Sequence, residues 1–288
     1  MLLNQDQLDE FHLRGFVVSR VPVLGEAEVD ELLAELQLVV ESKSAKKPVL
    51  NRNLVDGTAE YGEAPQTAKE VWQVVNIWEA SEKFLELARN PEITGTVARM
   101  CGNTPILRIW HDQIVSKPAT RGGRVGWHQD FLAWPIIEPG DLVGAWVALD
   151  DVEVENGCMW MVPGSHRWGA VRPRTGDALE PLYDEALLPE GAEVRPVPVQ
   201  VKRGHVAFHH CMTWHASPEN ESERHRRAIA IHYMPGYTIF MPRGRSHAVG
   251  KHVTVKPGEI LEGDGFPVVY ENKRNLEENL ERYTNKPA

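Results

Sequence analysis

The chain has 288 residues, of which 42% are hydrophobic and 25% are charged, proportions typical of a globular protein. The net charge of −10 argues against nucleic acid or an anionic membrane surface as a partner, because binding to phosphate groups requires clustered Lys and Arg. Three widely spaced cysteines predict neither a disulfide framework nor a cysteine-based zinc site. Because acidic residues occur early and no long apolar run is present, the sequence predicts a cytoplasmic protein with no signal peptide and no membrane span.

The first third of the chain is predicted to be mostly helical. Apolar side chains recur at the spacing of a helix in three segments, residues 3–16, 25–42 and 81–102. Gly15 is expected to end the first helix, before a strand at residues 16–21, and Pro91 is expected to divide the last segment into two helices. Residues 44–65 are polar and contain glycine and proline, which predicts a loop or lid.

The pattern changes after about residue 104, where short β-rich runs begin. Turn residues such as EPGD, ENG, PGSH and KRG separate these runs, which are found at residues 105–118, 142–152, 157–166, 194–210 and 226–235. Many short strands at this spacing indicate a β-sandwich or a β-barrel, and the spacing alone does not distinguish the two.

The segment GWHQDFLAWP, residues 126–135, places a histidine and an aspartate two positions apart between two tryptophans. Side chains two positions apart on a β-strand point to the same face, so His128 and Asp130 can bind one metal ion at adjacent positions. A third ligand is available among the histidines of residues 204–222. Two histidines and one carboxylate on one face of a metal ion leave three positions open, which is the ligand set of non-haem Fe(II) oxygenases.

Two further motifs follow in order, VPGSHRWG at residues 162–169 and TWHASPENESERHRRAIAIHY at residues 213–233. Together with GWHQD, they resemble the phytanoyl-CoA dioxygenase family of Fe(II)/2-oxoglutarate oxygenases, which includes the bacterial ectoine hydroxylases. The resemblance is strongest from about residue 107 to residue 235. It implies a mainly β fold with flanking helices, whose core is a double-stranded β-helix of the jelly-roll, cupin-like type.

The same resemblance implies that residues 1–288 form a single dioxygenase domain. Residues 1–103 would be a mostly helical part that packs on the barrel, and residues 104–270 would be the β-helix core. Residues 271–288 would form a charged tail, as a surface helix or a frayed end.

The resemblance also implies that His128, Asp130 and His215 bind Fe(II). His215 is the histidine that is followed, as in the family, by Ser217, then an asparagine and then an arginine. The earlier histidines of this region, His205, His209 and His210, come too soon in the pattern. His209 and His210 are expected to be strand residues or to lie behind the ligands.

Arg226 follows His215 by 11 residues, which is the family position of the arginine that binds 2-oxoglutarate. A guanidinium group suits this task because it can bind a carboxylate with two parallel hydrogen bonds. Its neighbour Arg227 would point to the opposite face of the strand. The resemblance implies that Ser217, Gln113 and Trp146 also contact 2-oxoglutarate, although Trp146 could equally be a core aromatic residue.

Trp134 corresponds to a tryptophan on the substrate side in the ectoine hydroxylases, and it too could be a core residue. One departure concerns a lysine that some members place in the helical region before the barrel to bind 2-oxoglutarate. The corresponding segment here contains Gln73. Several basic residues could bind an anionic group or form a solvated face, namely Lys117, Arg121, Arg124, Arg172 and Arg174.

The sequence thus predicts an Fe(II)- and 2-oxoglutarate-dependent dioxygenase that uses O2 to hydroxylate an unactivated C–H bond of a small molecule, with release of succinate and CO2. Desaturation, epoxidation and ring formation remain open as outcomes, and so does the identity of the substrate. Two other classes of function are also open. One is a metal-dependent, cupin-type isomerase or hydrolase, and the other is a non-catalytic small-molecule-binding protein of the same fold.

Overall fold

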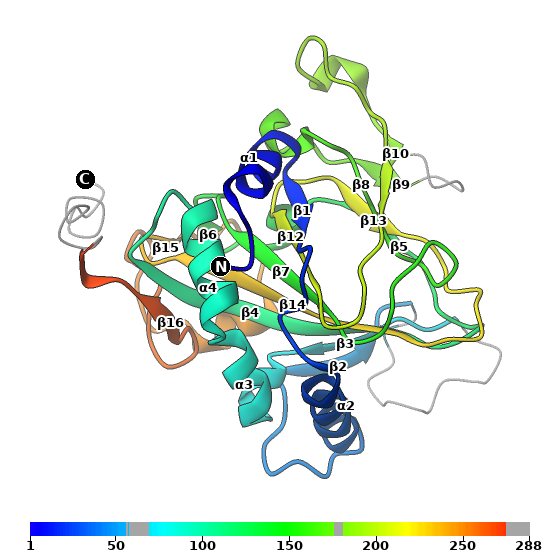
Figure 1. Ribbon diagram of the computed structural model, residues 1–288. Helices are drawn as coiled ribbons and strands as arrows, with labels where there is room; N and C mark the ends of the chain where they lie inside the picture. The colour runs from blue at the N-terminus through cyan, green and yellow to red at the C-terminus, as the bar shows by residue number, and fades with distance from the viewer. Residues whose placement is uncertain (56, 58–68, 176–180, 275–288) are drawn as a thin grey trace.

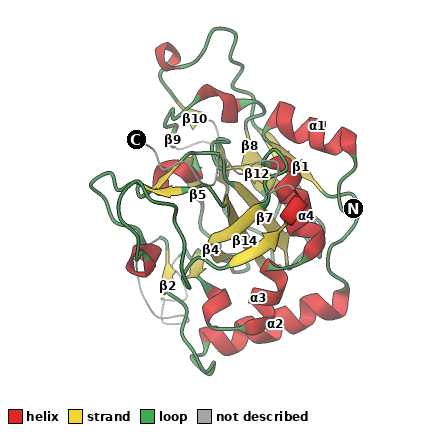
Figure 2. Ribbon diagram, turned by 90° about the vertical axis from the view of Figure 1, so that its left-hand side faces the viewer, coloured by secondary structure: helices red, strands yellow, loops and turns green. Residues whose placement is uncertain are grey.

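Two antiparallel β-sheets form the core, and the helices cover the outer face of the larger sheet (Figure 1, Figure 2). The computed structural model describes residues 1–55, 57, 69–175 and 181–274. The larger sheet follows the order β1-β12-β7-β14-β4-β3-β2, and β16 also pairs with β4. Its strands are β1 (Phe16–Val18), β2 (Leu50–Asn53), β3 (Trp72–Val75), β4 (Ile106–Lys117), β7 (Val143–Ala148), β12 (Val206–His210), β14 (Arg226–Pro235) and β16 (Val268–Glu271).

The smaller sheet has the order β11-β8-β13-β5. Its strands are β5 (Val125–His128), β8 (Met159–Met161), β11 (Val197–Val199) and β13 (His215–Ser217). The chain passes repeatedly from the larger sheet to the smaller one, from β4 to β5, from β7 to β8 and from β12 to β13, before it returns in β14. Two short pairs lie outside both sheets, β6 (Ile137–Glu138) with β15 (Ile239–Phe240), and β9 (Arg174–Thr175) with β10 (Pro181–Leu182).

The helices have the local signals that the sequence predicts. They are α1 (Gln5–Arg14), α2 (Glu26–Val40), α3 (Glu82–Ala88) and α4 (Pro91–Met100), with 3-10 helices η1 (Ile77–Glu79), η2 (Asp130–Ala133), η3 (Ser165–Trp168), η4 (Glu185–Leu187) and η5 (Ala248–His252). Asn4 and Gln7 form a capping box at the start of α1, and Gly15 ends the helix with a left-handed φ of 84°. Pro91 is the first residue of α4, where its missing N–H has no helical partner to lose. The predictions at Gly15 and Pro91 are confirmed.

The outer face of the larger sheet carries large aliphatic and aromatic side chains. On β14, Ile229, Ile231 and Tyr233 alternate outwards and join one hydrophobic cluster with the apolar faces of the helices. The Tyr233 hydroxyl donates to the carbonyl of Ala88 at the end of α3, at 2.9 Å. In Figure 2 the four α-helices gather on this side of the sheet.

The inner face of the same sheet carries small residues instead. On β14, Ala228 and Ala230 alternate with the outward residues, Ala148 of β7 is the partner of Ala228, and Ala207 of β12 and Ala230 flank Trp146 of β7. Small side chains on this face leave room for a cavity between the two sheets. The fold therefore separates a packed outer layer from an inner face that can hold ligands.

Two expectations about the first third of the chain are wrong. Within the expected loop 44–65, residues 50–53 form β2, which pairs with β3, while residues 58–65 lie outside the described residues. The segment of Gln73 is not helical but forms β3, because its backbone pairs with β4. In the expected tail, Glu271 ends β16, and residues 275–288 are not among those described. No helix of the described residues is long and apolar enough to span a bilayer.

Candidate metal centre and anion pocket

Three side chains converge between the two sheets. His128 ends β5, His215 begins β13, and the two residues are direct partners in the antiparallel pairing, with ring centroids 4.1 Å apart. The sequence predicted that Asp130 would lie on the same strand as His128, but it does not. It begins η2 after the chain leaves β5 at Gln129, whose side-chain amide donates to two backbone carbonyls. Ligand atoms of the three residues lie within 4.8 Å of one another, close enough to hold one metal ion.

Backbone carbonyls set the orientation of both imidazole rings. Nδ1 of His128 donates to the carbonyl of Gly126 at 2.8 Å, and Nδ1 of His215 donates to the carbonyl of Thr213 at 2.9 Å. A carbonyl oxygen can only accept, so each ring in its neutral form carries its hydrogen on Nδ1 and presents the Nε2 lone pair. These Nε2 atoms lie 3.5 Å and 3.6 Å from Oδ1 of Asp130. The three donor atoms therefore face one point, as metal ligands do.

The charges of this cluster suit a cation. Burial alone would raise the pKa of Asp130, but His215, His128 and His209 outweigh it and hold that pKa well below its usual value. Burial, followed by the nearby His128, lowers the pKa of His215 to about 3. An ionised carboxylate beside a neutral imidazole is the protonation state that binds a divalent metal.

A cavity of about 130 Å³ opens from this centre along the inner face of the larger sheet. Four of the residues predicted to contact 2-oxoglutarate line it, namely Gln113, Trp146, Ser217 and Arg226. Trp134 is not among the described residues that line this cavity. It is buried behind His232, with the two rings 4.8 Å apart, in a cluster with Trp110.

Arg226 lies in this cavity as a fully buried cation, with only 1% of its surface exposed. Its Nε and one terminal nitrogen donate to the carbonyl of Gly157, at 3.3 Å and 2.9 Å, and its guanidinium lies 5.3 Å from the ring centre of Trp146. Burial lowers the pKa of Arg226 to about 10, so it stays protonated at neutral pH. Its other terminal nitrogen, Nη1, has no hydrogen-bond partner among the described residues. A buried, unpaired donor on a cation is costly unless an anion binds there.

Lys117 places a second basic side chain beside Arg226, since the two residues are partners in the pairing of β4 with β14. Its Nζ donates to the hydroxyl of Ser217 at 2.7 Å, to the carbonyl of Ser217 at 3.2 Å and to the carbonyl of Pro218. Burial, and then the charge of Arg226, lowers the pKa of Lys117 well below its usual value. Within the part of the chain that the structure describes, the hydrogen bonds of both basic side chains go to backbone carbonyls and the Ser217 hydroxyl, and neither side chain forms an ion pair. The alternative of a solvated face is wrong for Lys117, and the alternation of β4 is the signal that could have shown this.

The loop between β7 and β8 presents the backbone carbonyl of Gly157 to Arg226. Asn156 is fully buried in this loop, donates to the carbonyl of Asp151 at 2.7 Å and accepts from the backbone N–H of Glu153 at 2.8 Å. Gly157 has a φ of 82°, and a Cβ there would lie 2.8 Å from the carbonyl oxygen of Pro218, so a residue with a side chain does not fit at this position. Hydrogen bonds within the loop therefore fix its shape, and the carbonyl of Gly157 holds the guanidinium of Arg226 in place.

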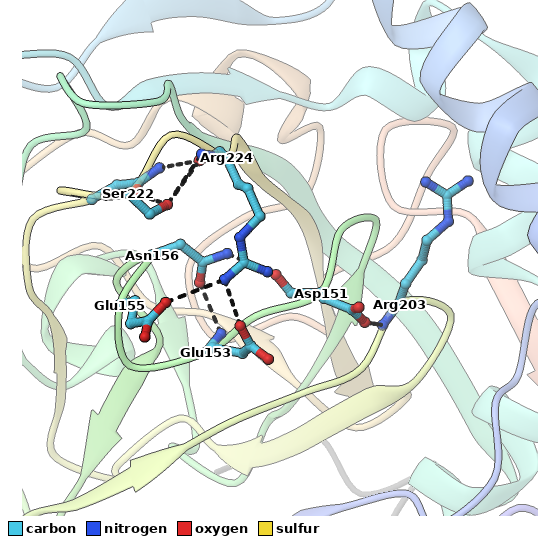
Figure 3. Close-up of polar contacts among 8 residues, drawn as sticks. Asp151, Glu153, Glu155, Asn156, Arg203, Ser222 and Arg224 are labelled. Carbon is cyan, nitrogen blue, oxygen red and sulfur yellow. Dashed lines mark hydrogen bonds and ion pairs between the residues drawn. The ribbon is translucent and has the colours of Figure 1, made fainter.

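Arg224 joins this loop to the segment that leads into β14 (Figure 3). It forms ion pairs with Glu153 at 2.5 Å and with Glu155 at 3.7 Å, and its backbone carbonyl accepts from Ser222. These exposed pairs contribute little stability. The position of Gly157 therefore depends mainly on contacts inside the loop, which include the buried amide of Asn156 and the hydrogen bond from Gly157 N–H to the carbonyl of Val154.

A chain of amide groups lines the other wall of the cavity. Gln73 donates to Gln113, Gln113 lies 3.4 Å from Nε2 of His232, and Arg52 donates to Gln73 at 3.0 Å. Gln73 and Gln113 both line the cavity, so the residue at the position of the family's lysine does face the site. Here it supplies an uncharged amide.

Two facing antiparallel sheets, wound by a chain that alternates between them around a two-histidine, one-aspartate centre, define a double-stranded β-helix metalloprotein. The chain belongs to the phytanoyl-CoA dioxygenase (PhyH) family, whose sequence model matches residues 11–228. The expected fold and the expected family are confirmed.

Individual relatives agree with this assignment. The chain is 30% identical over 164 residues to phytanoyl-CoA dioxygenase domain-containing protein 1 of Mus musculus, a match that covers 55% of the chain and 55% of that protein. The chain thus spans about half the length of this relative. It is also similar to the crystal structure of the non-heme alpha ketoglutarate dependent carbocyclase SnoK from nogalamycin biosynthesis, with 28% identity, a TM-score of 0.71 and coverage of 92% of this chain and 96% of that one.

A second similar structure is the epimerase SnoN in complex with Fe3+, alpha ketoglutarate and nogalamycin RO. It is 26% identical to this chain, with a TM-score of 0.69, and covers 92% of this chain and 98% of that one. The family and these structures belong to metal- and 2-oxoglutarate-dependent enzymes, and they include reactions other than hydroxylation.

Proposed function

We propose that the protein is an Fe(II)- and 2-oxoglutarate-dependent dioxygenase that oxidises a small molecule. One observation carries the proposal. The cavity that begins at the His128, Asp130 and His215 centre also holds the buried Arg226, whose Nη1 is unpaired among the described residues. A dicarboxylate that binds a metal at one end and a guanidinium at the other fits both features. The similarity to SnoN, whose structure contains Fe3+ and alpha ketoglutarate, supports the same reading.

Different residues of the chain bind the metal and the 2-oxoglutarate. His128, Asp130 and His215 hold the metal, and Arg226 binds the far carboxylate of 2-oxoglutarate with Ser217, whose hydroxyl Lys117 orients. When bound, the metal and 2-oxoglutarate supply the oxidising chemistry, in which O2 is consumed and succinate and CO2 are released. Trp146 and the small residues of β14 shape the cavity and exclude water from it.

The central test is turnover of 2-oxoglutarate. The purified protein is incubated with Fe(II), 2-oxoglutarate and ascorbate, and both succinate formation and O2 uptake are measured without added substrate. We expect slow succinate formation that Asp130→Ala abolishes. A metal-dependent isomerase or hydrolase, or a binding protein of this fold, would form no succinate, so the absence of succinate with and without a panel of small molecules would refute the proposal.

For the reaction itself we propose hydroxylation of an unactivated C–H bond. SnoK and SnoN, a carbocyclase and an epimerase, are the specific reason to keep ring formation and epimerisation as the second candidates. Once a panel of small molecules has identified a compound that stimulates succinate release, its product is analysed by mass spectrometry under ¹⁸O2. One ¹⁸O atom in the product supports hydroxylation, while a product of unchanged oxygen content supports cyclisation, epimerisation or desaturation.

A further inference from the structure

We propose that His209 is a positioning residue of the metal centre, which holds the outer oxygen of Asp130 so that the other oxygen faces the metal. The inference rests on the function proposed above, because His209 has this task only if the centre binds a metal. It concerns a residue that is not itself part of the three-ligand cluster.

The first argument is the division of the Asp130 carboxylate between two partners. Oδ1 lies 3.5 Å and 3.6 Å from Nε2 of the two ligand histidines, which makes it the oxygen that faces the metal. Oδ2 lies 2.9 Å from Nε2 of His209. An ionised carboxylate has no hydrogen to donate, so Nε2 of His209 must be the donor.

The second argument is burial. His209 is 2% exposed and Asp130 is 7% exposed, so bulk water does not compete for this hydrogen bond. The terminal torsion of an aspartate is soft, and without a partner on Oδ2 the carboxylate can rotate away from the metal. A hydrogen bond to a charged acceptor is short and strong, which suits it to fix this torsion. Partners of this kind behind metal ligands influence both metal affinity and ligand orientation.

The third argument is the space that the sheet reserves for the ring. Gly144 of β7 is paired with His209 on one side and with His232 on the other, and all three residues share the inner face. A Cβ on Gly144 would lie 2.8 Å from Cε1 of His209, 3.1 Å from its Nε2 and 3.2 Å from Nδ1 of His232. Neither ring is at the end of a flexible chain, so any larger residue at position 144 would displace His209 from Asp130.

The neighbour His210 provides a matched control. It lies one position further along β12, where its Nδ1 accepts from the backbone N–H of Met212 at 3.1 Å and its ring lies 5.5 Å from that of His166. His210 is therefore a histidine of the same strand whose contacts lie away from the ligands.

The experiment measures Co(II) binding to the metal-free, full-length protein by calorimetry and by the visible absorption of the bound ion. Five proteins are compared: the wild type, His209→Phe, His209→Gln, Gly144→Ala and His210→Phe. Thermal unfolding of each metal-free protein is recorded in parallel, so that a variant that fails to fold is recognised. Neither measurement requires turnover.

We expect His209→Phe to weaken Co(II) binding about 10- to 100-fold and to change the absorption spectrum, the range usual for loss of a partner behind a ligand. His209→Gln, which keeps an N–H donor of similar reach but no imidazole, should recover most of that loss. Gly144→Ala should weaken binding although every ligand is present, and His210→Phe should bind Co(II) like the wild type.

Three outcomes would overturn the proposal. Wild-type affinity in His209→Phe would show that the hydrogen bond does not position Asp130. Equal loss in His209→Phe and His209→Gln would mean that the imidazole itself, as a ligand or as packing, matters rather than its donated hydrogen. Failure of the wild type to bind Co(II) would remove the metal centre and with it the proposed function, whereas the first two outcomes leave that function intact.

Discussion

Two buried aspartates on opposite sides of the larger sheet respond to burial in opposite ways. Asp130 lies on the inner side among histidines, and its pKa is held well below the usual value. Asp112 lies on the outer side under η1, and burial raises its pKa to about 8. Backbone N–H groups of η1 act against this, and that of Trp78 donates to Oδ2 of Asp112 at 3.3 Å. Both carboxyl groups are removed from water, so their partners decide the difference.

The contrast extends to the two faces as a whole. The inner face concentrates small residues, two buried basic side chains and histidines around a cavity, whereas the outer face is filled with aliphatic side chains under the helices. Substitutions on the inner face should therefore change ligand binding, and substitutions on the outer face should change stability. Adjacent residues of a single strand allow this distinction to be tested.

The largest effect is expected at the metal ligands. His128→Ala, Asp130→Ala and His215→Ala should each abolish succinate formation and weaken Co(II) binding by more than the roughly 10- to 100-fold that loss of an outer partner costs. The reason is that a three-ligand centre has no spare ligand. Calorimetry and the succinate assay check this, and near wild-type turnover in His215→Ala would assign the third ligand to another histidine.

A comparison of Arg226 with Arg227 tests the two faces directly. Arg226→Ala should weaken 2-oxoglutarate binding by on the order of 2–5 kcal/mol, because the far carboxylate loses its buried partner. Arg227 points outwards and donates to both oxygens of Asp150, at 2.8 Å and 2.7 Å, so Arg227→Ala should leave that affinity unchanged. Anaerobic titration of the Fe(II)-loaded protein with 2-oxoglutarate, followed by absorption, measures both. The opposite result would assign the anion site to Arg227.

The next residues along β14 test packing. Ile229→Ala on the outer face should lower the free energy of unfolding by about 2–4 kcal/mol, because it leaves a cavity in the main hydrophobic cluster, and should not alter Co(II) affinity. Ala230→Val on the inner face should instead obstruct the cavity and weaken 2-oxoglutarate binding. Urea unfolding and ligand titration of both variants measure these effects. Weaker 2-oxoglutarate binding in Ile229→Ala with no loss of stability, or the reverse in Ala230→Val, would contradict the division into two faces.

The smallest expected effect is at Asp112 and depends on pH. Its pKa is about 8 in the folded protein, against an ordinary value of 3.8, so the folded state keeps a proton that the unfolded state loses as the pH rises between these values. The contribution of Asp112 to the free energy of unfolding is thus fully present below about pH 4 and is lost progressively as the pH rises to about 8. Asp112→Asn removes this decline, because the amide carries no proton that the unfolded state can lose, so the variant should be more stable than the wild type at pH 7.5.

Thermal unfolding of the wild type and of Asp112→Asn from pH 4 to pH 8 measures this effect. The difference in Tm should be near zero at pH 4 and should grow as the pH rises. A constant difference would show that Asp112 is ionised in the folded protein.

Much of the architecture and the candidate site could be predicted from the sequence. The order of the motifs indicated the family and the fold, and the residues taken from them, His128, Asp130, His215 and Arg226, do line one cavity. The expected position of Asp130 on the strand of His128 was wrong, because η2 begins at that residue. Trp134 was expected at the substrate side, and the structure packs it behind His232.

The sequence by itself determined what depends on a few neighbouring residues. Capping at Asn4, termination at Gly15, the break at Pro91 and the inward or outward direction of Arg226 and Arg227 follow from local geometry and from the two-residue period of a strand. Only the tertiary structure decided what depends on residues far apart in the chain. It buried Lys117 beside Arg226, made Gln73 part of a strand that pairs with β4, and brought His209 into hydrogen-bond contact with Asp130. Each of these contacts joins segments that are distant in the chain and meet only when the tertiary structure forms, and burial then removes the water that would otherwise satisfy their polar groups.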